Sequence, residues 1–223
     1  MKRGILTTIT ILVLILVMTI QPALASGVAY EPGNTQTGTY GVQADIYTPG
    51  AWPYTEVIQA SWVAVNNGPN NANSWVQTGW LYDCSPGDPW YNNIWAVSYT
   101  ELQIFGGTHD VEFYGVHNWS SSKNYKILFV QGAVGWWVLY IDNSLKVLYN
   151  DPSLPTPPTP GLAWSEVQNS TSTYLLTSFN NVQYRDSTGN WHLFNQNNYY
   201  NALPYHVLPA GSNIDYSYTT WGP

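Results

Sequence analysis

Two short segments of the chain combine aromatic residues with one side chain capable of hydrolytic chemistry. The run Trp-Val-Gln-Thr-Gly-Trp contains Gln77, and the run Ala-Trp-Ser-Glu-Val contains Glu166. Successive side chains of a β-strand point to opposite faces, so Gln77 shares a face with Trp75, and Glu166 shares one with Trp164. A carboxyl group and a carboxamide in an aromatic cleft could activate a water molecule and bind an oxyanion. Gln77 and Glu166 are therefore the candidates for a catalytic pair.

Short β-prone runs separated by turn residues must position these two side chains. Helical periodicity is almost absent, and turn signals such as Gly106-Gly107 recur between the runs. The pattern predicts a single all-β domain built as an antiparallel double-sheet β-sandwich. The strands expected are Tyr40–Tyr47, Glu56–Asn66, Ser74–Leu81, Ile94–Ile104, Asp110–His117, Asn124–Gln131, Gly135–Asp142, Ser144–Tyr149, Leu162–Gln168, Phe179–Arg185, Trp191–Leu193 and Asn213–Thr219.

The N-terminal segment has the pattern of a targeting signal. Lys2 and Arg3 precede an apolar run from Ile5 to Ile20, which is followed by Ala-Leu-Ala ending at Ala25. This order predicts a secretory signal over residues 1–25, cleaved after Ala25, and therefore a secreted protein. Two alternatives remain open, an uncleaved membrane anchor and a pilin-type leader. No second membrane segment is expected.

The predicted domain occupies residues 38–223 after a short lead-in over residues 26–37. The Pro-rich stretch 151–160 is too short to divide domains, so we expect a stiff surface loop there. Nothing in the sequence indicates an oligomer, and a monomer is expected.

The composition excludes nucleic acid as a partner. The chain has 6 Lys and Arg against 13 Asp and Glu, and a net charge of −7. A nucleic-acid interface requires clustered basic residues. Only 9% of the residues are charged, whereas 16% are aromatic, which indicates a packed domain with a surface of amides and hydroxyls. Such a surface changes little in charge at low pH, so we expect the protein to tolerate acid.

Cysteine and histidine provide no cofactor site. Cys84 is the only cysteine, so no intramolecular disulfide can form, and its turn-rich surroundings favour a plain loop residue over a nucleophile. The histidines lack the spacing of metal ligands, and no phosphate-binding loop is present. Neither a metal ion nor an organic cofactor is expected. Two glycosylation sequons begin at Asn118 and Asn169.

Several segments in the same order resemble neprosin-type domains. The stretch 40–49, Trp62 with its neighbours, the paired tryptophans at Trp136, and the segments around Gln77 and Glu166 carry this resemblance. It extends over about residues 38–223. It implies a glutamic peptidase on a concanavalin-like double-sheet β-sandwich, with a peptide or protein as substrate.

The resemblance also implies roles for two residues. Glu166 matches one catalytic Glu of neprosin-type domains, whereas Gln77 stands where they have their second Glu. Fungal glutamic peptidases use a Gln/Glu pair, and the run around Gln77 is similar to their Gln motif. The cysteine pair common in plant neprosins is absent.

The resulting hypothesis is peptide hydrolysis in acid. Desolvation in an aromatic cleft raises the pKa of a carboxyl group, which would let Glu166 alternate between base and acid. The Gln77 carboxamide would donate to the oxyanion. In the alternative structural interpretation, Glu166 is a rim carboxylate and Gln77 an ordinary strand residue. The residues expected to line the substrate groove are Trp62, Trp75, Trp80 and Trp164.

Two other functions compete with the peptidase. Asp110 and Glu112 are two residues apart on one expected strand, and paired carboxylates serve glycosidases, with Glu101 as a possible support. The 12 Trp and 18 Tyr could instead form a carbohydrate-binding or cell-envelope structural module without catalysis. Tryptophans aligned on a flat exposed face would favour that module, and tryptophans gathered around Gln77 would favour the peptidase.

Overall fold

The computed structural model contains two β-sheets packed face to face. It describes residues 29–30, 33–49, 58–66, 74–83, 96–103, 109–117, 120–168, 175–196, 198–201, 203–209 and 218–222. All regular elements in these ranges are strands, and none of the described residues forms a helix that could span a membrane. The predicted signal, Cys84 and both sequon asparagines, Asn118 and Asn169, lie outside the described residues.

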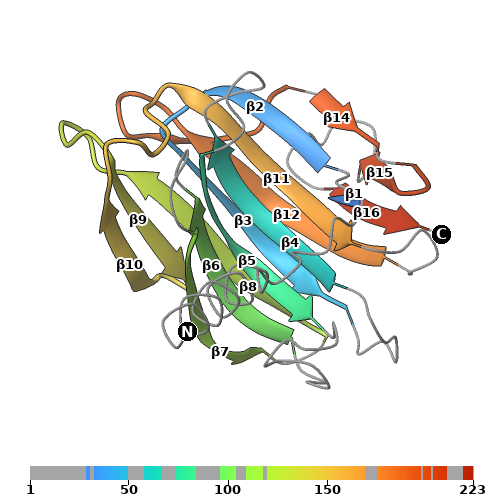
Figure 1. Cartoon of the computed structure of the whole chain (residues 1–223). Helices are drawn as coiled ribbons and strands as arrows, with labels where there is room; N and C mark the ends of the chain where they lie inside the picture. Colours follow the sequence, from blue (N-terminus) through green and yellow to red (C-terminus); the bar gives the residue numbers. More distant parts are fainter. Residues whose placement is uncertain are drawn as a thin grey trace, which may run out of the picture.

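Sheet A is the front layer in Figure 1 and carries both candidate catalytic residues. Its strands follow the order β14-β2-β11-β4-β5-β6-β7, with the short β1 beside β11, and all pairs are antiparallel. The strands are β1 (Ala29–Tyr30), β2 (Gly33–Thr39), β4 (Ile58–Asn66), β5 (Trp75–Asp83), β6 (Ala96–Gln103), β7 (His109–His117), β11 (Thr159–Gln168) and β14 (Asn198–Tyr200).

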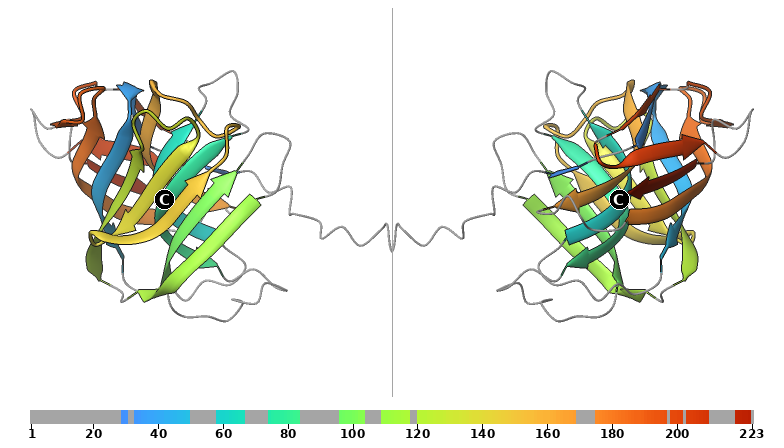
Figure 2. Two further views of the ribbon diagram at one scale, coloured as in Figure 1. Left: turned by 90° about the vertical axis from the view of Figure 1, so that its left-hand side faces the viewer. Right: turned by 90° about the vertical axis from the view of Figure 1, so that its right-hand side faces the viewer.

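Sheet B forms the second layer, and the side views in Figure 2 show the two layers together. Its order is β10-β9-β8-β3-β12-β16-β15, with β13 paired to β12, again antiparallel throughout. The strands are β3 (Gly41–Thr48), β8 (Ser121–Phe129), β9 (Trp136–Ile141), β10 (Ser144–Asn150), β12 (Leu175–Arg185), β13 (Trp191–Leu193), β15 (His206–Pro209) and β16 (Tyr218–Gly222). The predicted all-β sandwich of two antiparallel sheets is confirmed.

Alternating side chains from both sheets fill the space between the layers. In β3 the residues Val42, Ala44 and Ile46 are fully buried, while the residues between them are partly exposed. Sheet A contributes Val63 and Trp80 from its opposing face to the same cluster. Full burial of an aliphatic or aromatic side chain contributes about 1.5–3 kcal/mol, so this layer is the main source of stability.

Buried hydroxyl groups connect the two sheets across this apolar layer. Ser98 of β6 and Tyr125 of β8 share a hydrogen bond of 3.1 Å. Burial raises the pKa of the Tyr125 phenol well above its usual value, so this group stays neutral. Ser165 of β11 bonds both Ser61 of β4 at 2.8 Å and Thr220 of β16 at 2.7 Å. Each bond joins neutral partners and satisfies groups that would otherwise be buried unpaired.

Two segments differ from the sequence-based expectation. Strands β1 and β2 occupy much of the segment expected as a lead-in, so residues before position 38 already belong to sheet A. The Pro-rich stretch is not wholly a surface loop. Leu154 is buried in the core, Trp137 Nε1 donates to the Pro155 carbonyl at 3.0 Å, and β11 begins at Thr159.

A carboxylate organises the turn between β12 and β13. Asp186 accepts hydrogen bonds from the Thr188 hydroxyl at 2.7 Å, the Thr188 amide at 2.8 Å and the Asn190 amide at 2.9 Å, and it pairs with His192 Nε2 at 2.7 Å. The Thr188 hydroxyl, and then His192, hold the pKa of Asp186 well below its usual range. The ionised form is therefore the one that the turn stabilises.

We predict that Asp186→Ala lowers the melting temperature at neutral pH and has progressively less effect in acid. A depressed folded-state pKa gives stability that is present above the unfolded value of about 4 and is lost as the pH falls through the folded value. Thermal unfolding of both proteins at pH 7, 4 and 2 measures the difference. Asp186→Asn keeps an acceptor oxygen without the charge and serves as the control. An equal effect of Asp186→Ala at pH 7 and pH 2 would contradict the assignment.

Candidate active site

Continuous antiparallel pairing of β11, β4 and β5 puts Gln77 and Glu166 on the same face of sheet A. Glu166 pairs with Ala60, and Ala64, four residues further along β4, pairs with Gln77. Directly paired residues point to the same face, and so do residues two or four apart on one strand. This face, here called the outer face, is turned away from sheet B, because the intervening residue Val63 belongs to the inter-sheet core.

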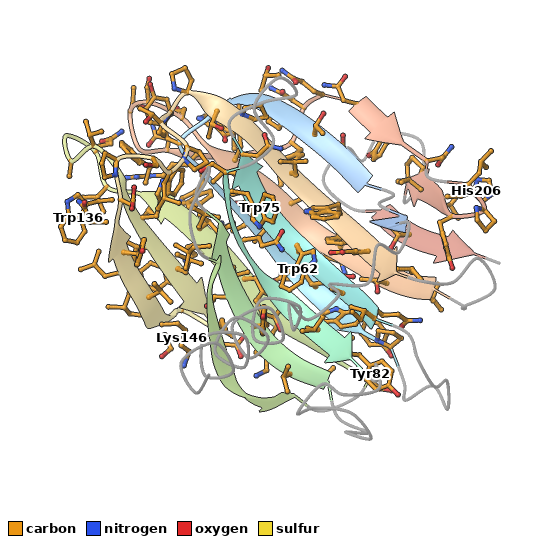
Figure 3. All side chains as sticks on the ribbon, viewed as in Figure 1. Trp62, Trp75, Tyr82, Trp136, Lys146 and His206 are labelled. Carbon is orange, nitrogen blue, oxygen red and sulfur yellow. The ribbon has the colours of Figure 1, made fainter. Side chains whose placement is uncertain are left out.

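Trp62 lies midway between the two candidate catalytic residues. It pairs with Trp164 on β11 and with Gly79 on β5, so Glu166 and Gln77 are both its diagonal neighbours. Diagonal neighbours are about 7–8 Å apart, within reach of long side chains. The backbones of Gln77 and Glu166 are offset by about 13 Å along the strands and about 10 Å across them. The two side chains therefore flank the Trp62 indole rather than lie next to each other. Figure 3 shows Trp62 and Trp75 in front of sheet A.

A hydrogen bond joins Trp62 to the candidate catalytic carboxyl group. Trp62 Nε1 donates to Glu166 Oε2 at 3.1 Å. Only 2% of Trp62, 4% of Gln77 and 9% of Glu166 is exposed. When Glu166 is ionised, the N–H group of Trp62 forms a charge-assisted bond with it, which is stronger than a bond between neutral groups. The Glu166 carboxyl group is therefore held in a defined direction, toward the middle of the site.

A row of paired residues across sheet A leaves space for the indole rings of Trp62 and Trp164. From β2 to β6 the paired residues are Gly33, Trp164, Trp62, Gly79 and Tyr99. The rings of Trp62 and Tyr99 lie 5.7 Å apart on either side of Gly79. A Cβ at Gly33 would come within 2.5 Å of the Trp164 Cβ, and one at Gly79 would overlap the Ser61 carbonyl. Gly33 and Tyr99 were not among the residues expected at the site. Only their register relative to Trp164 and Gly79 reveals them.

The predicted groove residues divide between the two faces of sheet A. Trp62 and Trp164 belong to a small apolar cluster on the outer face together with Ala60, Val97 and Tyr99. Trp75 is partly exposed and is two residues from Gln77 on the same strand.

The expectation for Trp80 needs correction. It is fully buried in the core between the sheets, because it is an odd number of residues from Gln77 and therefore points to the opposite face. It cannot line a substrate site on the outer face.

The other candidate carboxylates lie on strands β6 and β7. The backbone of Glu101 pairs with Gln77, whereas Asp110 pairs with Leu102 and Glu112 with Thr100. The side chains of these three acidic residues are outside the described part of the structure. Among the described residues, no group of three His, Cys, Asp or Glu could hold a metal ion.

Comparison with solved structures identifies proteins of similar fold. No family model and no curated protein matches the sequence. The chain is similar to scytalido-glutamic peptidase in complexes with a transition-state analogue inhibitor and with a peptide-based analogue. The TM-scores are 0.57 and 0.55 at 13% and 14% sequence identity. It is also similar to SCP-B, a member of the eqolisin family of peptidases in complex with the tripeptide Ala-Ile-His, with a TM-score of 0.51 and 13% identity.

Each of these alignments covers 87% of this chain and 98% of the other. At these identities the similarity establishes the fold, which this chain shares with glutamic peptidases. The resemblance to neprosin-type domains stays a prediction.

We predict that Gly79→Ala destabilises the protein by about 1–3 kcal/mol or more, because the added methyl group must displace the backbone of β4. Urea unfolding measures the change. Gly38→Asn is the control, since that position is exposed, has φ +74° and leaves nothing within 4 Å of an added Cβ. Asn tolerates this backbone region, so the control should cost about 1 kcal/mol or less. Equal losses in the two variants would contradict the close approach of β4 and β5.

Proposed function

We propose that this protein is a secreted endopeptidase of the glutamic type, which hydrolyses peptide bonds in acid through Gln77 and Glu166. The observation that supports this most strongly is the pairing register, which gives both side chains the same face of sheet A with Trp62 between them. The fold shared with glutamic peptidases supports the same reaction class.

The proposed reaction needs one acid–base group and one hydrogen-bond donor. Glu166 takes a proton from a water molecule whose oxygen attacks the peptide carbonyl carbon. The Gln77 amide donates to the carbonyl oxygen as negative charge develops on it. When the C–N bond breaks, Glu166 returns the proton to the leaving nitrogen. Glu166 and Gln77 are the two protein groups that these reaction steps require, and water is the nucleophile.

The substrate in this proposal is a peptide in extended form. The outer face presents apolar and aromatic side chains around Glu166, of which Trp164 and Leu81 are partly exposed. This composition suits a peptide with apolar side chains near the bond that is cut. A carbohydrate-binding module is less well supported, because Trp62 and Trp164 gather next to Glu166 rather than on a flat exposed surface.

The first test of this function is substitution of the pair. Glu166→Gln should abolish cleavage of denatured protein substrates while the melting temperature stays close to that of the wild type, since the two side chains are nearly isosteric. Gln77→Ala should lower kcat by about a hundred- to a thousand-fold, the usual loss of an oxyanion donor. Gln77→Glu should retain part of the activity, because neprosin-type domains place Glu there. A fully active Glu166→Gln protein would disprove the proposal.

The second test is the dependence on pH. Activity of the protein without residues 1–25 should be greatest in acid and absent at neutral pH. Glu166 must keep the proton it takes from water until the leaving nitrogen accepts it, and at neutral pH the carboxyl group would lose this proton to the solvent first. Pepstatin-type inhibitors should have no effect, as no paired aspartates take part. Assays from pH 2 to 8 on an unfolded protein provide the measurement. Purified protein that cleaves nothing between about pH 2 and 6 would leave the binding module as the better account.

A further inference from the structure

The indole N–H of Trp62 donates a hydrogen bond to Glu166 Oε2 at 3.1 Å. Trp62 is also the residue that separates Glu166 from Gln77 in the register of the sheet. Trp62 therefore contacts the carboxyl group of Glu166 in addition to lining the site. How firmly it orients this carboxyl group depends on the packing of its ring and on the other groups nearby.

Packing fixes the Trp62 ring. Its outer face neighbours include Tyr99, with ring centroids 5.7 Å apart and planes at 55°, and the paired residue Gly79 has no side chain that could displace it. With 2% of its surface exposed, the indole has little freedom to rotate. A fixed donor selects one orientation of the acceptor, so the ring determines where the Glu166 carboxyl group points.

Among the described side chains, few titratable groups lie on the strands next to Glu166. On the strands beside Glu166, β4 carries no titratable residue, and the described part of β2 carries none. Tyr99 of β6 is on the same face. The remaining titratable residues of β1, β5 and β6 are Tyr30, Tyr82, Asp83 and Glu101. Tyr82 belongs to the core between the sheets, and the side chains of the other three lie outside the described residues.

We infer that Trp62 is a positioning residue that directs the Glu166 carboxyl group toward Gln77 and favours its ionised form. This inference rests on the proposed function. The hydrogen bond acts twice, because it aims the carboxylate that must take a proton from water and because a donated N–H stabilises the carboxylate over the carboxylic acid. Trp62 itself takes no part in proton transfer.

Trp62→Phe tests this role, since it keeps an aromatic ring next to Tyr99 and removes the N–H. We expect kcat/KM to fall by about ten- to a hundred-fold, the usual effect of losing a hydrogen bond to a charged group. The pH at which Glu166 becomes protonated should rise, so the upper limit of the pH–activity profile should move to higher pH.

The matched control is Trp137→Phe in sheet B. Trp137 also combines one aromatic contact, to Phe129 at 5.3 Å, with one indole hydrogen bond, to the Pro155 carbonyl at 3.0 Å, and it too is buried. This variant should lose stability while its kcat/KM stays within about two-fold of the wild type and its pH profile is unchanged. Equal changes in activity and pH profile for the two variants would overturn the inference.

A spectroscopic measurement separates this inference from the peptidase proposal. In 15N-labelled protein, the indole N–H resonance that is missing from Trp62→Phe identifies Trp62. This resonance should shift between pH 2 and 8 as Glu166 titrates, and the shift should disappear in Glu166→Gln. A resonance that does not respond to pH in the wild type would refute the interaction. If the resonance titrates but no peptide is cleaved, the peptidase proposal fails and the Trp62–Glu166 interaction stands.

Discussion

The antiparallel register of β11, β4 and β5 is the constraint on which the candidate site depends. Because side chains alternate with a period of two, a slip of one residue between β4 and either neighbour would move Glu166 or Gln77 into the core. The pairing is protected on the inner face by the Ser61–Ser165 hydrogen bond and at Gly79 by the close approach of the β4 backbone. The local geometry of three strands therefore determines which chemical groups meet on the outer face.

The same strands hold the sandwich together, so positioning and stability are coupled. Ser165 lies between Trp164 and Glu166 in the chain, yet its hydroxyl points the other way and reaches Thr220 of sheet B. Among the described residues, hydroxyl groups and apolar contacts connect the two sheets, and neither changes charge in acid. One pH-sensitive feature, the Asp186 turn, lies at the β12–β13 connection. A core of this kind is compatible with work at low pH, which the proposed reaction requires.

The sequence predicted the class of fold and the shared faces, because both follow from local alternation. The strand around Gln77 and the strand around Glu166 were expected and are present. The same alternation assigns Trp80 to the core, and its expected place in the groove followed from its aromatic character rather than from its position. Strand β2 was missed because its residues, from Gly33 to Thr39, include no large apolar side chain.

Hydrogen bonds to residues far away in the sequence explain why the polar strand β2 forms part of the sheet. The side-chain oxygen of the buried Gln36 accepts a hydrogen bond from the backbone amide of Asn195. The Thr39 hydroxyl donates to the Thr159 carbonyl. The offset between Gln77 and Glu166 depends in the same way on the pairing of β4 with two strands, one of them remote in the chain. No local signal in the sequence encodes that pairing. The location of Trp62 between Gln77 and Glu166 could therefore be found only from the structure.

A crystal structure of the Glu166→Gln protein with an uncleaved peptide tests the central claim most directly. The account predicts that the peptide lies on the outer face of sheet A across Trp62, with one peptide carbonyl oxygen within hydrogen-bond distance of the Gln77 amide and the same carbonyl group next to residue 166. A peptide bound on sheet B, or on sheet A without contact to residues 77 and 166, would contradict it.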